Sequence, residues 1–485
     1  MNCDTGVLNR FEARRLPFYL TFASVVAVLC SNSASNCLIA SAVVALLVCH
    51  FRFGGALRFP PVKLPLGLFF LATLISLALS GHIGEGWPGP RKFYLCVVLL
   101  LVASTFRKLS EVRALVVACT GMMTLSALWS LGQFWRKVQE AQALHEDFRV
   151  YYTVKRITGF TSHWMTLSGQ EMIVLMLLGA LLFFAAGGWL ARWLAAAGVV
   201  IVIAFVAAYT RSMWMGAALG GGYLVWQRDR RWLLLAPVPV ALLLWLNPMG
   251  VGNRMMSVYH PAGDLDSNQF RVVCRRAGWE MIKAHPWFGL GPEQVKAQFL
   301  QYIPADVPRP LPTGAYMHLH NVYLQYAAER GVPALAAFLW FLGRMLWDFL
   351  RAARRTTARE GERRFVLYGA IAVTIALLSA GWYEHNLNDG HILPLFLAVC
   401  ACGYLAVPGP GKTCVPRREN QNQKPSSTKG ASLVPPSMAP EGADRAALSA
   451  EARIPLLPNL VFVFSALNPA SLRLRGESNP RLLPA

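Results

Sequence analysis

Residues 166–226 read TLSGQEMIVLMLLGALLFFAAGGWLARWLAAAGVVIVIAFVAAYTRSMWMGAALGGGYLVW, and this stretch decides the class of fold. It contains three apolar runs in succession, at about 166–186, 191–209 and 212–226, with few charged residues. An α-helix needs about 20 apolar residues to cross ~30 Å of hydrocarbon, and each run has or approaches that length. The stretch therefore predicts consecutive membrane-spanning helices.

The same pattern continues through most of the chain. Further apolar runs lie at about 16–31, 34–51, 62–80, 91–106, 111–135, 231–247, 321–350, 365–384 and 391–407. Of the 485 residues, 55% are hydrophobic and only 15% are charged, and the mean hydropathy is +0.40, which is too apolar for a soluble domain of this length. Only helices and closed barrels satisfy all backbone polar groups in lipid. We therefore expect an all-α polytopic membrane protein with about twelve transmembrane helices over residues 16–407.

Basic residues are concentrated in alternate loops between these runs. Because short loops rich in Lys and Arg stay in the cytoplasm, residues 1–15 and the tail from 408 to 485 are predicted to lie there. The loops predicted on the same side contain Arg52, Arg58, Lys63, Arg107, Lys108, Arg113, Arg228, Arg230, Arg231 and a dense cluster between 351 and 364. The net charge of +21 and the pI of about 9.9 then reflect topology. No basic-aromatic recognition segment stands out, so nucleic acid is not an expected partner.

Two segments interrupt the apolar pattern on the opposite side of the bilayer. They are the segment 136–165 and the longer segment 248–319, which lies between the ninth and tenth predicted helices. Long loops of this kind usually carry function. Of the ten cysteines only Cys274 falls in the longer loop, so no disulfide framework is expected. The tail at 408–485 is rich in Pro, Ser, Lys, Glu and Gln and is predicted to be disordered, and its apolar patch at 460–467 is too short to span.

Three arginines lie at the outer face. Arg211, in AYTRSMWMG, stands where one predicted helix ends and the next begins, and a charge at that depth either faces a cavity or partner or snorkels to the interface. Arg156 and Arg271 lie in the two outer segments, where a lone arginine is usually a solvated surface charge. If the three converge, they suit a diphosphate, because guanidinium groups bind phosphate oxygens bidentately and stay charged.

A histidine begins the tenth apolar run, in MHLHNVYLQYAAERGVPALAAFLWFL at residues 317–342. The imidazole of His320 would stand in water-accessible space with a pKa suited to general base work on a hydroxyl. Two other interpretations compete: a plain helix-start histidine, and a metal-binding pair formed by His318 and His320. No Cys or acidic ligand is placed near that pair in the sequence, so neither a metal nor another cofactor is expected.

The segment HNVYLQYAAERGVPALAAFL resembles the O-antigen ligase and polymerase superfamily, whose members carry a His followed by Asn, Ser or Gln, then nine residues and a glycine. His320, Asn321 and Gly331 fit this spacing, whereas Ala334 and Leu335 depart from the glycine and threonine that follow in the family. Upstream, RAGWEMIKAHPWFGLGPEQV is similar to the family's stretch with a His-Pro pair and a Gly-x-Gly. In this chain those residues are His285, Pro286, Gly289 and Gly291.

The resemblance covers roughly residues 150–405 and implies roles for the candidate residues. The family's essential arginines correspond to Arg211 and Arg271, with Arg156 as a third. These arginines would hold the diphosphate and offset charge on the leaving group. His320 would deprotonate the acceptor hydroxyl, so that His320, Arg211 and Arg271 form the catalytic set. The predicted substrate-binding set is Arg156, Asn321 and His318.

The implied activity is a metal-independent, inverting transfer of a glycan from an undecaprenyl diphosphate carrier to an acceptor hydroxyl. The reaction would take place at the periplasmic face of the bacterial inner membrane. A ligase would transfer to lipid A core, a polymerase to another carrier-linked repeat, and a third branch of the superfamily to protein serine or threonine. The long 248–319 loop and the helix number favour the ligase.

A transporter is the alternative of another class. Against it, the sequence shows no inverted repeat, and its polar residues gather at one face. Gly216 and Gly220 form a G-x-x-x-G that predicts close helix packing. The final outer turn, WYEHNLNDGH at 382–391, contains Glu384, His385, Asp389 and His391. This turn either positions the acceptor or is simply solvated, and we favour a solvated loop.

Overall fold

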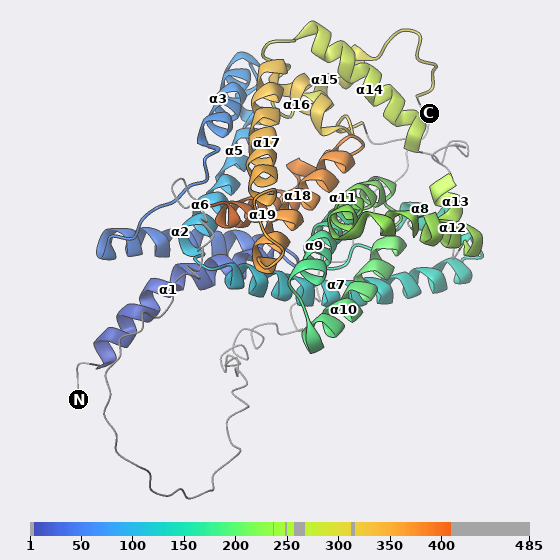
Figure 1. Cartoon of the computed structure of the whole chain (residues 1–485). Helices are drawn as coiled ribbons and strands as arrows, with labels where there is room; N and C mark the ends of the chain where they lie inside the picture. The colour runs from blue at the N-terminus through green and yellow to red at the C-terminus, as the bar shows by residue number, and fades with distance from the viewer. Residues whose placement is uncertain (1–3, 236, 248–249, 257–266, 312–315, 409–485) are drawn as a thin grey trace, which may run out of the picture. The chain divides into compact units, whose positions relative to one another are not determined.

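The computed structural model describes residues 4–235, 237–247, 250–256, 267–311 and 316–408, and Figure 1 shows their arrangement. Within these ranges the chain forms α-helices and short 3-10 helices, without a strand. They belong to one compact unit, Met1–Cys414. The predictions for the tail after Pro408, including the apolar patch at 460–467, lie outside the described residues.

Long helices account for the predicted apolar runs. They are α1 (Asp4–Ala27), α2 (Asn32–Phe53), α3 (Lys63–Leu79), α6 (Val97–Thr105), α7 (Leu109–Ala143), α9 (Trp164–Phe184), α10 (Gly188–Ala207), α11 (Arg211–Asp229), α12 (Pro237–Leu246), α17 (Val332–Ala353), α18 (Gly361–Gly381) and α19 (Ile392–Ala406). The shorter elements are α4 (Ile83–Gly86), α5 (Pro88–Arg91), η1 (Lys92–Cys96), α8 (Phe148–Val154), η2 (Arg230–Leu235), α13 (Val251–Met256), α14 (Ser267–Ala284), α15 (Val295–Gln298), η5 (Phe299–Tyr302), α16 (Val322–Arg330) and η6 (Asn386–Asn388).

Among the described helices, six are long and apolar enough to cross a membrane: α2, α7, α9, α10, α17 and α18. Three shorter apolar helices lie at Arg15–Ala27, Lys63–Leu79 and Ile392–Ala406. A polytopic helical membrane protein is thereby confirmed, while the total of twelve spans stays a prediction. Helix α7 continues to Ala143 and α8 follows, so part of the 136–165 segment is helical.

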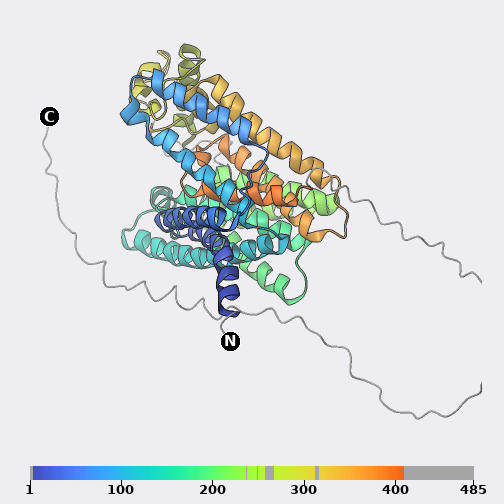
Figure 2. The same ribbon diagram turned by 90° about the vertical axis from the view of Figure 1, so that its left-hand side faces the viewer.

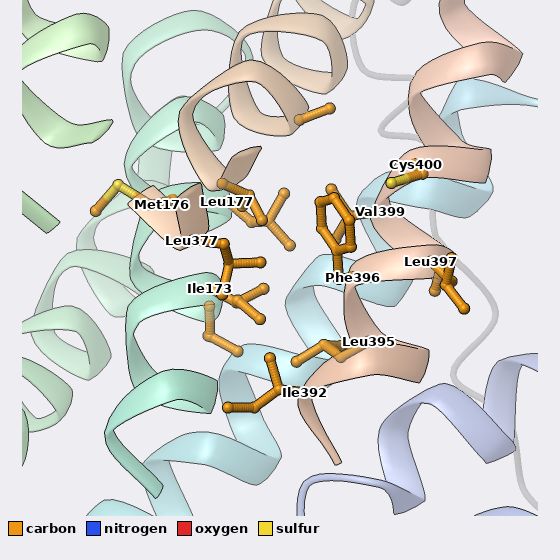
Figure 3. Close-up of a cluster of buried hydrophobic side chains, with 14 of the residues drawn as sticks. Ile173, Met176, Leu177, Leu377, Ile392, Leu395, Phe396, Leu397, Val399 and Cys400 are labelled. Carbon is orange, nitrogen blue, oxygen red and sulfur yellow. The ribbon is translucent and has the colours of Figure 1, made fainter. Parts of the chain in front are cut away.

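The centre of the bundle is formed by α9 and α18, with α11 and α19 against them. Figure 3 shows side chains from three of these helices meeting, among them Ile173, Leu377 and Phe396, all of which are buried. Gly216 and Gly220 bring α11 close to α18: a Cβ at either position would stand 2.5 or 2.6 Å from the carbonyl oxygens of Ala376 and Ala372. The predicted packing role of these two glycines is confirmed.

The segment between α12 and α16 forms a small core of its own. One face of the amphipathic helix α14 buries Phe270, Cys274 and Met281, which cluster with Phe299 and Leu319. This core rests on α16 through Ala327 and Ala328, and Figure 1 shows α14 and α15 gathered beside α16. The longer outer segment is therefore anchored to the bundle along α16.

The predicted run at 321–350 is interrupted at Gly331, which separates α16 from α17. Leu290 N donates to Ala328 O and Gly291 N to Glu329 O, both at 2.9 Å, and Val332 N donates to Pro286 O at 2.8 Å. The His-Pro loop thus pairs with the helix break, and the two stretches that carry the family resemblance bind each other.

Gly331 is required at this break for two reasons. Its φ of +84° is a conformation that side chains disfavour, and an added Cβ would clash with the carbonyl oxygen of Trp287. Beyond the break, α17 runs back across the bundle beside α3, as Figure 2 shows.

The two ends of the bundle can be told apart by hydrogen bonds between turns. Val28 O, in the turn between α1 and α2, accepts from Gln170 Nε2 at 2.9 Å and bonds His391 Nδ1 at 2.8 Å. This places the α1–α2 turn beside the α18–α19 turn and the start of α9, at what we call the site end. The start of α1, the end of α2 and the start of α7 lie at the opposite end, which we call the far end.

Candidate active site

A cavity of about 330 Å³ opens at the site end, where α9 and α11 begin and α18 ends. Helix α14, the short helix α13 and the loop before α16 complete its walls. Its polar lining consists of Arg156, His163, Thr210, Arg211, Ser212, Arg254, Arg271, His318, His320 and Glu384. The structure thus brings together residues from Arg156 to Glu384, which are far apart in the sequence.

Five of the six predicted site residues line this cavity: Arg156, Arg211, Arg271, His318 and His320. The sixth, Asn321, is not part of the lining. Its side chain instead caps α16, with Oδ1 accepting from the backbone N–H groups of Tyr323 and Leu324, each at 2.9 Å.

Arg211 is the first residue of α11, and its side chain is only 9% exposed. The chain turns into α11 through Tyr209, whose φ of +55° lies in the left-handed region. Ser168 of α9 donates to Thr210 Oγ1 at 3.1 Å and ties this turn to the neighbouring helix. An arginine held at this depth faces the cavity, as the sequence analysis required for a functional role.

Arg156 follows α8 and reaches the same cavity from the other side. Its Nε donates to Thr153 O at 3.1 Å and its Nη1 to Tyr209 O at 3.4 Å, and its guanidinium lies 5.1 Å from the ring centre of Trp164. Burial, together with the positive charges of Arg211 and Arg271, lowers the pKa of Arg156 to about 10. The side chain therefore remains positively charged near neutral pH.

Glu384 is central to the site, and the expectation of a solvated final loop is wrong for this residue. Its side chain is buried, with 2% exposure. Oε1 accepts from Arg271 Nη2 and from Ser212 Oγ, while Oε2 lies 3.4 Å from His320 Nδ1. One carboxylate thus contacts the predicted base and one of the predicted arginines.

The rest of the 382–391 turn is structural. Asp389 Oδ2 accepts from Thr166 Oγ1 at 2.6 Å, and its Oδ1 accepts from the backbone N–H groups of His391 and Ile392, at the start of α19. Of the four residues considered in the sequence analysis, none is exposed. His385, Asp389 and His391 are partly buried, and His391 Nδ1 bonds Val28 O in the turn that joins α1 and α2.

Opposing influences set the ionisation of Glu384. Burial alone would raise its pKa, but Arg271 and the neighbouring His320 and His318 outweigh burial and hold the pKa below its ordinary value. The carboxylate is therefore ionised at neutral pH, as a partner for a cation or for a ring N–H must be.

His320 lies immediately before the cap residue Asn321 and has a φ of +49°, which is rare for a residue with a side chain. Asn321 Nδ2 donates to Trp382 O at 3.0 Å and thereby joins this loop to the turn that contains Glu384. Strained backbone of this kind persists where surrounding contacts hold it, and it is concentrated at functional sites.

The imidazole of His320 has one engaged and one unengaged nitrogen. Nδ1 faces Glu384, whereas the buried Nε2 has no hydrogen-bond partner in the part of the chain that the structure describes. A carboxylate at Nδ1 stabilises the tautomer with a proton there, which leaves the Nε2 lone pair able to accept a proton. The rings of Phe270 and His318 pack against the imidazole of His320, with ring centroids 5.0 and 4.0 Å from its own.

His318 is the second histidine of the cavity lining. Burial, with the neighbouring His320, lowers its pKa to about 4, so it is neutral at physiological pH. Among the described residues there is no group of three His, Cys, Asp or Glu side chains placed to hold a metal ion.

Arg254, His163 and Glu384 were not among the predicted site residues. Arg254 lies in α13, inside the long outer segment, where no local pattern separates it from a surface arginine. His163 is the N-cap of α9 and accepts from Met165 N at 3.2 Å. For Glu384 a signal was present, since it follows an apolar run directly in WYEHN.

Fold and site together define a polytopic helical membrane protein with an arginine- and histidine-lined cavity at one end of its bundle. The family model described as O-antigen ligase matches residues 196–339, which include Arg211, Arg254, Arg271, His318 and His320. This match confirms the predicted resemblance to the O-antigen ligase superfamily and indicates an enzyme of the membrane glycosyltransferase type. No curated protein matches the chain.

Proposed function

We propose that this protein is an O-antigen ligase-like glycosyltransferase. It transfers a glycan from undecaprenyl diphosphate to a hydroxyl of lipid A core, with the site end facing the periplasm and both chain ends in the cytoplasm. The observation that carries the proposal is the joint placement of His320, Glu384 and Arg271, with Arg211 and Arg156, around one cavity.

Proton transfer is assigned to His320. Its Nε2 takes the proton of the acceptor hydroxyl while that oxygen forms a bond to the anomeric carbon. Glu384, at Nδ1, orients the ring and stabilises the imidazolium that results. The proton later leaves to solvent, which restores the neutral base.

Leaving-group stabilisation is assigned to the arginines. As the new bond forms, the bond between the anomeric carbon and the diphosphate oxygen breaks, and its electron pair goes to the diphosphate. Arg211, Arg271 and Arg156 line the cavity where this charge develops and would offset it without a metal ion. Attack from the side opposite the leaving group inverts the anomeric centre.

A buried carboxylate limits how the cations are used. Glu384 pairs with Arg271, so part of the positive charge of Arg271 is offset before the donor binds. We propose that Arg271 holds Glu384 in position and also contacts the donor. His318, which is neutral, offers a hydrogen bond without adding charge.

The acceptor is tested by expression in two bacterial strains, one lacking its O-antigen ligase and one lacking its polymerase. The lipopolysaccharide ladder is then examined, with the His320→Ala chain as control. We expect capped core in the first strain and none with the variant. Long chains restored only in the second strain would show a polymerase. If neither strain is rescued although the protein inserts normally into the membrane, transfer to either acceptor is contradicted. Protein glycosylation or transport would then be the functions to test.

A further inference from the structure

A second cavity, of about 340 Å³, lies at the far end of the bundle. It is enclosed where α1 begins its apolar part, α2 ends, α6 ends and α7 begins. The candidate active site is at the opposite end of these helices, because the α1–α2 turn lies beside the α18–α19 turn. The two cavities share no lining residue.

Positive charge dominates this second cavity. Arg15, Arg107 and Lys108 line it, together with His50. The acidic residue in the lining is Glu111, whose Oε2 accepts from the backbone N–H groups of Arg107 at 2.7 Å and Lys108 at 3.0 Å. That carboxylate is therefore occupied in capping α7, where the helix N-terminus offsets its charge.

Much of the remaining lining is apolar, although Ser104 and Thr105 also belong to it. Pro17, Phe18, Leu46 and Phe53 form the apolar part of the cavity wall. Beside them, the outer surface of α2 exposes apolar side chains that have no protein cover, namely Leu47, Val48 and Phe51. Exposed apolar residues on a membrane-spanning helix face lipid chains, so hydrocarbon reaches the rim of the cavity.

We propose that this cavity binds the phosphate of an anionic phospholipid, whose acyl chains lie along α1 and α2. Basic pockets between helices on the cytoplasmic side suit such headgroups. A free phosphate would share the polar contacts but would leave the apolar wall unused. Arg354 and Arg355, which are exposed after α17, do not line this cavity. The site is independent of the glycan transfer proposed above.

Native mass spectrometry and thermal unfolding of the purified full chain test this proposal. The protein is titrated with phosphatidylglycerol, with phosphatidylcholine and with inorganic phosphate. We expect retained phosphatidylglycerol and a raised unfolding midpoint, with a weaker effect of the other two. The double variant Arg107→Gln, Lys108→Gln should bind phosphatidylglycerol roughly thirtyfold more weakly, since each of the two cations near a headgroup contributes about 1 kcal/mol.

The matched control is Arg354→Gln, Arg355→Gln, which removes the same charge from exposed residues at the far end. It should bind phosphatidylglycerol as the wild type does. Ala56→Trp narrows the cavity without changing its charge and should therefore weaken phosphatidylglycerol binding. This variant replaces the Arg107→Gln, Lys108→Gln variant in the test if that protein does not fold. Equal losses in both charge variants, equal binding of the two lipids, or equal stabilisation by inorganic phosphate would overturn the proposal.

Discussion

Glu384 makes the two ring nitrogens of His320 different from each other. It contacts Arg271 with one oxygen and faces His320 Nδ1 with the other, so the ring nitrogen left for chemistry is Nε2. In this arrangement a base is oriented by a third group, a recurring feature of general base and nucleophile pairs. In the proposed mechanism the carboxylate therefore positions His320 and does not accept a proton from substrate.

Glu384→Gln tests this role at the level of one atom. Gln keeps the size of the side chain but removes the negative charge, and it can stabilise the unproductive tautomer of His320. We expect the transfer rate to fall roughly 100-fold with little change in donor KM. Ser212→Ala, which removes the longer contact to the same carboxylate, is the control and should change the rate much less. An unchanged rate in Glu384→Gln would show that the carboxylate is not needed.

Arg271→Lys separates charge from shape. Lys keeps the positive charge but has no planar fork, so it cannot contact Glu384 and a diphosphate oxygen together. We expect at least a roughly tenfold loss in kcat/KM for the glycan donor, measured at equal protein level in membranes. Full activity in this variant would mean that a point charge suffices and that the fork has no role.

Residue types and their neighbours in the sequence were enough to predict Arg211, Arg271 and His320. Arg211 and His320 stand at predicted helix ends, whereas Arg271 lies in the long outer segment and was indicated by the family resemblance. Glu384 was misjudged for a physical reason: it packs against α14, α11 and the loop before α16, which are remote from it in the sequence. Hydropathy in a window cannot report such packing.

The break between α16 and α17 is the element that pairs with the His-Pro loop. From the sequence, Gly331 was assigned to the family's His-Asn…Gly motif, and it lay within one predicted apolar run at 321–350. The interruption arises from tertiary backbone pairing with Pro286, Leu290 and Gly291, which no local pattern reveals. Loss of that pairing would release both α16 and the loop that contains His320.

Gly331→Ala is expected to destabilise the protein. The positive φ and the clash with Trp287 O together cost about 2 kcal/mol or more, so the thermal unfolding midpoint should fall. Gly343→Ala in α17 is the matched control, because open space surrounds that position, and it should leave the midpoint unchanged or raise it slightly. Equal midpoints for both variants would contradict the account of the helix break.

The two ends of the helix bundle carry different sets of polar side chains. One end holds the histidine and arginine cavity, and the other holds the basic residues that predict the cytoplasmic side. The fold class was predictable from composition because lipid restricts a chain of this kind to helices. The number of membrane spans was harder to predict from composition, because several helices are short or broken.

Topology is tested by reporter fusion. A fluorescent protein attached after residue 408 should fold and fluoresce, because the tail is predicted to be cytoplasmic, whereas an alkaline phosphatase inserted after Ala143 should be active in the periplasm. The reverse result would place the candidate site in the cytoplasm and contradict the proposed access to a periplasmic acceptor.

The central claim is that His320 acts as the base in glycan transfer. The most direct measurement is the single-turnover rate of transfer from an undecaprenyl-diphosphate-linked glycan to lipid A core, with purified wild-type protein and His320→Ala. The account predicts transfer by the wild type and a rate lower by at least roughly 100-fold in the variant, because positioned general bases contribute factors of that order. A variant that folds and transfers at the wild-type rate would contradict it.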